Sequence, residues 1–105
     1  MYKGDRRIFE RFAVNFSAEL KPFGAQEVSP AQCHDVSANG VGLFSQEKLI
    51  PDINLEVHLG IPNGHAPFQG KARVVWSKQV QENRWRSGLE LKAVDFMRLR
   101  RALSL

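Results

Sequence analysis

The sequence predicts a mostly β domain, a small antiparallel barrel or sandwich of six strands followed by one C-terminal α-helix. Six short stretches alternate apolar and polar residues, which is the period of a half-buried strand. Prolines, glycines and asparagines separate several of these stretches, and the last one is followed by a segment of helical periodicity. With 105 residues and no internal repeat, the chain is expected to form one domain.

The first strand is expected to begin at Arg11, after a flexible N-terminal arm over residues 1–10. The arm is polar and charged, and only Ile8 and Phe9 are available to anchor it. Residues 11–105 are expected to form the β domain and its helix. In the first strand apolar side chains occupy every second position: Phe12, Val14, Phe16, Ala18 and Leu20.

A loop over residues 22–30, with two prolines and one glycine, is expected to lead into two short strands over residues 31–36 and 41–45. The dipeptide Asn39-Gly40 lies between these strands. Both residues tolerate the positive φ of a tight turn, so the dipeptide predicts a two-residue hairpin.

The fourth strand is the clearest in the sequence, because apolar residues alternate without interruption from Ile53 to Ile61. In the connection before this strand, Leu49 and Ile50 are expected to point inward. The Pro-Asn-Gly sequence of residues 62–64 predicts a turn after it.

The last two strands are expected over residues 68–77 and 85–91, joined by a polar hairpin loop over residues 78–83. Trp76 and Trp85 fall on the apolar faces and are interpreted as core residues. In the C-terminal segment Asp95 is expected to cap a helix, with Arg98 and Arg101 facing outward. Its apolar residues share one helical face: Phe96, Leu99 and Leu103.

The composition excludes several classes of protein. Cys33 is the only cysteine, which rules out an internal disulfide. Neither a secretory signal nor an apolar run long enough for a bilayer is present, so we expect a cytoplasmic protein without membrane contact. The net charge is +4 and nine of the fifteen basic residues are arginine. This balance suits an anionic partner, although solubility alone would also explain it.

No residue pattern points to catalysis. The histidines at 34, 58 and 65 have no metal-ligand spacing and are interpreted as surface or loop residues. Cys33 lies in a predicted strand and is interpreted as a small buried residue. The sequence places no histidine or lysine partner beside Ser37. We therefore expect no enzyme, no metal and no cofactor.

The predicted hairpin corner carries polar residues that suit a planar polar ligand. Asp35 accepts hydrogen bonds when ionised, Ser37 donates or accepts them, and Gly40 permits close approach to the backbone. The alternative is an Asx-type turn, in which both side chains bond only to the local backbone.

Two arginines lie four residues apart at the entrance of the first strand, as Arg7 and Arg11, with Arg6 beside them. Together with the Asp-x-Ser-x-x-Gly sequence of the hairpin, they resemble the signature of the PilZ domain family, which is Arg-x-x-x-Arg followed by Asp/Asn-x-Ser-x-x-Gly. The resemblance covers residues 5–103. The last two strands also look like that family, through Val75-Trp76 and Gly88-Leu89-Glu90-Leu91.

The resemblance implies a six-stranded antiparallel β-barrel with a C-terminal helix, acting as a receptor for the bacterial second messenger cyclic di-GMP. The spaced arginines would contact guanine edges and phosphates, because a guanidinium fork matches the O6 and N7 acceptors. Asp35 would accept from the N1–H and the N2 amine of guanine. The third arginine would add charge for a stacked ligand dimer. The implied binding residues are Arg6, Arg7, Arg11, Asp35, Ser37 and Gly40.

We expect the arm of residues 1–10 to order over the barrel on binding and to relay the signal to an unidentified effector protein. One alternative is a protein-interaction module of the same fold that binds no ligand and docks through its helix. Another is a barrel that binds single-stranded nucleic acid. We expect no nucleic-acid partner, because nearly all aromatic residues lie on predicted inward faces, away from any base.

Overall fold

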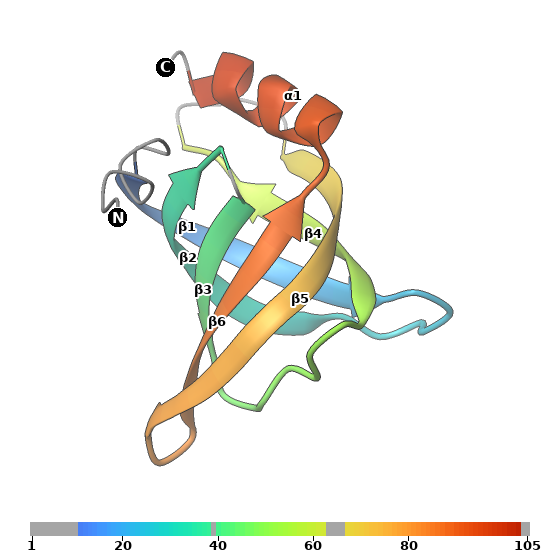
Figure 1. Ribbon diagram of the computed structural model, residues 1–105, viewed down its shortest axis with the longest axis vertical. Coiled ribbons are helices and arrows are strands. Elements are labelled where there is room, and N and C mark those ends of the chain that lie inside the picture. Colours follow the sequence, from blue (N-terminus) through green and yellow to red (C-terminus); the bar gives the residue numbers. More distant parts are fainter. Residues whose placement is uncertain (1–10, 39, 63–66, 104–105) are drawn as a thin grey trace, which may run out of the picture.

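The computed structural model describes residues 11–38, 40–62 and 67–103, which form six strands and one helix (Figure 1). The arm expected over residues 1–10 lies outside these ranges, and so does most of the turn expected at residues 62–64. In chain order the elements are β1 (Arg11–Pro22), β2 (Ser29–Ser37), β3 (Gly40–Ser45), β4 (Asn54–Gly60), β5 (Phe68–Gln81), β6 (Arg84–Leu91) and α1 (Ala93–Leu103).

The strands close into an antiparallel barrel in the order β1-β2-β3-β6-β5-β4, and β4 pairs back onto β1. Figure 1 shows α1 across one end of the barrel, and its Leu99 is fully buried in the core. The expected mostly β fold with a C-terminal helix is confirmed, and the architecture is a barrel instead of a sandwich. Within the described part of the chain, no helix combines the length and the apolarity needed to cross a bilayer.

The β1–β4 and β4–β5 ladders follow the predicted alternation without a register shift. The side chains that point inward from β1 and β4 belong to one core cluster. Burying a leucine or valine of this kind contributes roughly 1.5–3 kcal/mol relative to its exposure. The core residues of these two strands are Phe16, Ala18, Leu20, Leu55, Val57 and Leu59.

A β-bulge interrupts the alternation in β2. In the β2–β3 ladder Cys33 lies opposite Leu43 and Asp35 lies opposite Gly42, so His34 is an extra residue without a partner. His34 lies within the strand that was expected over residues 31–36, and its side chain is 19% exposed. Cys33 is fully buried, as predicted, and its thiol donates to the backbone oxygen of Asp35 across the bulge at 3.4 Å.

A second β-bulge lies in β5 and corrects the prediction for Trp76. Val74 is opposite Leu89 and Trp76 is opposite Gly88, so Val75 is the extra residue. The bulge ends the alternation after Val74, and Trp76 is 40% exposed instead of buried in the core. The run of three apolar residues in β5 thus contains one core residue and two residues that face outward.

The β5–β6 hairpin also differs from the expected loop over residues 78–83. The strands pair as far as Gln81, and the turn needs only two residues, with Asn83 at a φ of 57°. Figure 1 shows this ribbon extending past the other strands of the barrel. Trp85 is therefore half-buried, with the ammonium of Lys48 lying 5.8 Å from its ring, and it does not belong to the core.

Three smaller expectations are corrected by local contacts. Leu49 packs against the core, but Ile50 is 65% exposed, because it precedes a turn in which Asp52 adopts a φ of 71°. Gly40 is the first residue of β3, opposite Ser37, so it is not a turn residue, and the Asn39 of that turn lies outside the described residues. Asp95 is the third residue of α1 and accepts from the backbone N–H of Lys71 at 3.3 Å, so it does not cap the helix.

Candidate functional site

A hollow of about 650 Å³ lies on the outer face of the barrel, where β2, β3, β6 and β5 run side by side. Four of the six predicted binding residues line it: Arg11, Asp35, Ser37 and Gly40. Arg6 and Arg7 lie outside the described residues. The hollow therefore joins the end of the Arg-x-x-x-Arg motif to the Asp-x-Ser-x-x-Gly motif.

The β2–β3 hairpin is held tightly against β6 at Gly40. Gly40 has a φ of 146°, and a Cβ atom there would overlap the backbone carbonyl oxygen of Leu89. An L-residue therefore meets both a strained backbone and a clash with immobile backbone atoms. Glycine at this position lets β3 approach β6 and brings Ser37 to the rim of the hollow.

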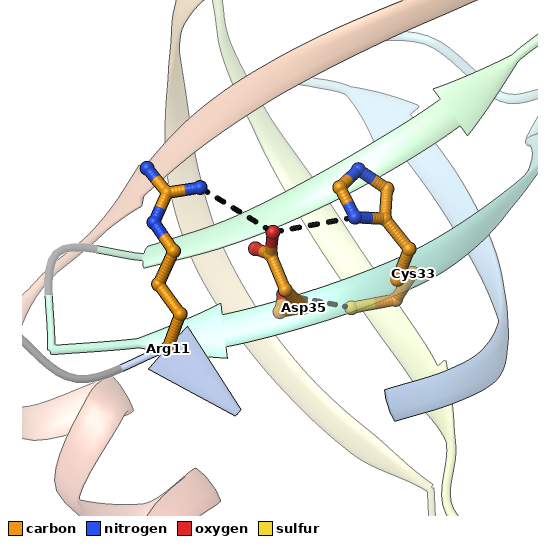
Figure 2. Close-up of polar contacts among 4 residues, drawn as sticks. Arg11, Cys33 and Asp35 are labelled. Atoms are coloured by element: carbon orange, nitrogen blue, oxygen red, sulfur yellow. Dashed lines mark hydrogen bonds and ion pairs between the residues drawn. The ribbon is translucent and has the colours of Figure 1, made fainter. Parts of the chain in front are cut away.

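Asp35 provides the acceptor side of the hollow, and its side chain is 17% exposed. Its Oδ2 atom lies 3.5 Å from a guanidinium nitrogen of Arg11, across the β1–β2 ladder (Figure 2). The same oxygen lies 3.3 Å from Nδ1 of His34. In the described part of the chain, Asp35 thus contacts other side chains, in contrast to the Asx-type turn considered above.

The floor of the hollow is made of two glycines that face each other on neighbouring strands. Gly42 of β3 is paired with Gly88 of β6. A Cβ on Gly42 would come within 2.7 Å of Asp35 Oδ1 and 2.8 Å of the His34 ring, and a Cβ on Gly88 would overlap the indole nitrogen of Trp76. His34 of β2 and Trp76 of β5 therefore each place a ring over this floor, which is glycine backbone without side chains.

Arg11 and Arg86 line the hollow beside this floor. The guanidinium of Arg86 lies 6.0 Å from the Trp76 ring, and that of Arg84 lies 4.0 Å from the ring of Phe44. Among the described residues, the buried Nε of Arg86 has no hydrogen-bond partner. A buried donor left without a partner costs on the order of 1–3 kcal/mol.

The histidine reports the electrostatics of the site. Burial lowers the pKa of His34, and the charges of Arg86, Arg11 and Arg84 lower it further, whereas the nearby Asp35 raises it. The imidazole is therefore mostly neutral near pH 7. Its ring packs against Phe44 with centroids 4.5 Å apart. The site combines cationic groups, the carboxylates of Asp35 and Glu90, and flat rings, which suits an anion that carries planar heterocycles.

The lining residues of the hollow that were not predicted as site residues include His34, Trp76, Arg86 and Glu90. The bulges bring His34 and Trp76 there, and strand alternation has no means of anticipating an extra residue. A signal did exist for the floor, since a glycine inside a strand often marks a bulge or a close approach. Gly42 and Gly88 both interrupt predicted strands, and alternation places Arg86 on the same outer face as Gly88.

No group of three His, Cys, Asp or Glu side chains within the described ranges is arranged to hold a metal ion.

Comparisons with known proteins place this geometry in context. The family model described as PilZ domain matches residues 5–103. The structure of the Bacillus subtilis inhibitor of motility (MotI/DgrA) is similar with a TM-score of 0.70 and 18% identity, covering 95% of this chain and 53% of that one. The PilZ domain of CeSA from a cellulose-synthesizing bacterium is similar with a TM-score of 0.65 and 13% identity, covering 91% of this chain and 99% of that one.

At these identities the two structures support the fold alone. The chain spans about half the length of the motility inhibitor. No curated protein matches the chain.

Proposed function

The chain belongs to the PilZ domain family, and from this premise we propose that it is a receptor that binds cyclic di-GMP in the hollow between β2, β3, β6 and β5. The observation that carries the proposal is the meeting of Arg11 and Asp35. They are 24 residues apart in sequence, yet they face each other at 3.5 Å over a floor of glycine backbone. PilZ domains are typically receptors without catalytic activity, and the proposed role needs no bond-making chemistry.

Each side of the hollow matches one part of the ligand. The Asp35 carboxylate would accept from the N1–H and the N2 amine of one guanine. Arg11 would meet a phosphate or the O6 and N7 atoms of guanine, joined by Arg6 and Arg7 from the N-terminal arm. Trp76 is 40% exposed and offers its ring for stacking, and the guanidinium of Arg86 lies 6.0 Å from that ring.

The proposed output is ordering of the arm. With Arg6 and Arg7 bound to ligand, residues 1–10 would fold over the hollow and present a new surface to an effector protein that is still to be identified. Amide hydrogen exchange over residues 5–12 tests this step. Slower exchange in the presence of ligand supports it, whereas equally fast exchange with and without ligand would contradict it.

Calorimetric titration with cyclic di-GMP and cyclic di-AMP tests the proposed function. Both dinucleotides carry two phosphates, so their charge is matched. Adenine places an N6 donor where guanine has O6, and a bare N1 acceptor would face the carboxylate of Asp35. Each mismatch costs on the order of 1–3 kcal/mol, so we expect at least a hundredfold preference for cyclic di-GMP. Equal affinities would mean that the hollow recognises only the charge of the ligand and does not distinguish guanine from adenine.

One observation keeps nucleic acid as a second candidate ligand. Trp76 is exposed beside Arg86, so the expectation that the aromatic side chains lie inward does not hold at this position. A short single-stranded oligonucleotide belongs in the same titration series. Binding tighter than that of cyclic di-GMP would favour the nucleic-acid alternative. If neither ligand binds, the interaction-module alternative remains.

A further inference from the structure

We propose that His34 is a positioning residue, whose imidazole holds the Asp35 carboxylate in the orientation that receives the ligand and thereby makes ligand affinity depend on pH. The inference rests on the proposed function, because it concerns the same hollow. It assigns a role to a side chain outside both sequence motifs.

The bulge in β2 is the first step. Consecutive strand residues normally point to opposite faces of a sheet, so a regular β2 would direct His34 and Asp35 to opposite sides. His34 is instead the extra residue of the bulge, and both side chains line the hollow. A bulge that re-aims a side chain at a site is a recurrent feature of strands.

The two oxygens of Asp35 have different surroundings. Oδ2 lies 3.3 Å from His34 Nδ1 and 3.5 Å from an Arg11 nitrogen, whereas Oδ1 lies above the floor at Gly42. Both contacts therefore hold one oxygen and leave the other turned toward the floor. Gly42 has no side chain that would displace Oδ1 or the ring of His34.

The same contact determines which nitrogen of His34 carries the proton. An ionised carboxylate only accepts hydrogen bonds, so favourable pairing with Asp35 requires the proton of the neutral ring on Nδ1. Nε2 is then an acceptor, and among the described residues this buried atom has no partner. The ring is held by Phe44, with centroids 4.5 Å apart and planes inclined by 38°.

The charges around His34 decide the sign of the pH dependence. Asp35 of β2 faces the ring, and so do Arg11 of β1 and Arg84 and Arg86 of β6, while the neighbouring Phe44 and Gly42 of β3 are uncharged. Burial and the three arginines lower the pKa of His34 in the free protein. Two ligand phosphates would offset the arginines and raise that pKa. The complex then binds more protons than the free protein, so affinity increases as pH falls below 7.

Two substitutions separate the effect of the Nδ1–H donor of His34 from the effect of its aromatic ring. His34→Asn keeps a donor near the position of Nδ1 but does not titrate. His34→Phe keeps a ring against Phe44 but has no donor. In calorimetric titrations with cyclic di-GMP from pH 5.5 to 8.0, we expect the wild type to bind roughly three- to tenfold tighter at pH 5.5 than at pH 7.5.

At pH 7.5 we expect His34→Phe to weaken binding roughly 5- to 30-fold. The affinity of His34→Asn should stay within about threefold of the wild-type value and lose its pH dependence. His58→Asn is the matched control, because His58 pairs with Glu56 on β4, away from the hollow, and should leave the profile unchanged.

Wild-type affinity in His34→Phe, or a wild-type pH profile in His34→Asn, would overturn the inference. If His34→Phe does not fold, the profile of His34→Asn decides. If the wild type binds no cyclic di-GMP at any pH, the proposed function fails. The role of His34 is then tested by nitrogen NMR of the ligand-free protein. A neutral imidazole with its proton on Nδ1 supports the role, and one with its proton on Nε2 overturns it.

Discussion

The two sides of the barrel are built differently, although the same strands take part in both. The β1–β4 and β4–β5 ladders keep one register along their whole length. The β2–β3 and β5–β6 ladders contain register shifts, and between them lies a regular β3–β6 ladder with a pair of glycines. The regular side directs its apolar residues into the core, and the shifted side directs extra residues outward into the hollow.

The difference separates the packed core from the proposed binding surface. Leu20, Val57 and Leu59 of the regular side are at most 1% exposed and fill the core. The shifted side contains a buried Arg86 nitrogen with no partner among the described residues, together with glycine backbone in place of side chains. Substitutions on the two sides should therefore affect different measurements.

The largest effect is expected at Gly40, the first residue of β3. Gly40→Ala places a Cβ against the Leu89 carbonyl at a φ of 146°, so we expect a loss of roughly 3 kcal/mol or more in the free energy of unfolding. Gly24→Ala is the control, because its φ of 85° is also positive but nothing lies within 4 Å of the added atom. That variant should lose about 1 kcal/mol. Similar urea-unfolding midpoints for the two variants would contradict the close packing of β3 on β6.

The next largest effect is expected at Arg11, where a substitution should weaken ligand binding and leave the free energy of unfolding unchanged. Arg11→Ala should weaken cyclic di-GMP binding about 30- to 150-fold, or roughly 2–3 kcal/mol, because a charge-assisted contact is lost. Arg11→Lys should not restore it, since a point charge lacks the guanidinium fork. The side chain of Arg11 is 67% exposed, so the unfolding midpoint should hardly change.

The control for this prediction is Arg101→Ala, which removes an equal charge from an exposed position on α1. Its affinity should match that of the wild type. An equal loss in both variants would indicate that the protein responds to total charge instead of a defined contact.

The two tryptophans provide a sharper comparison, because both lie on the β5–β6 ribbon. Trp76→Ala should lower affinity by roughly 1–3 kcal/mol, through lost stacking, with little effect on unfolding. Trp85→Ala should show the reverse, since Trp85 is half-buried under Lys48 and does not line the hollow. Calorimetry and urea unfolding on both variants check this. Matching profiles for the two substitutions would contradict the outward rotation of Trp76 by the bulge.

The smallest effect concerns Cys33, which lies under the bulge in β2. Burial, and then the charge of Asp35, raises the pKa of the thiol from 9.0 to about 12. Above pH 9 the unfolded chain loses this proton while the folded chain keeps it, so stability falls as pH rises toward 12. We expect a slope of roughly 1 kcal/mol per pH unit relative to Cys33→Ala. Identical slopes from pH 9 to 11 would show that the thiol ionises freely.

Local periodicity was sufficient to predict much of this protein. Alternation identified β1 and β4 because the pairing of β1 has no register shift from Phe16 onward and the β1–β4 ladder has none at all. The helical face of Phe96, Leu99 and Leu103 follows from a period of 3.6 residues. Two spaced motifs were enough to indicate the family. They also named Arg11, Asp35, Ser37 and Gly40, which the fold brings into one hollow.

Tertiary structure decided the rest. A bulge exists only as a mismatch between two paired strands, so no property of β2 or β5 alone shows that His34 or Val75 is an extra residue. Each mismatch reverses the facing of the residues beside it, which turned Trp76 outward and set His34 beside Asp35. The sequence by itself determined which strands form and which motifs they carry. The pairing of those strands determined which side chains the hollow contains, because facing depends on register and register belongs to pairs of strands.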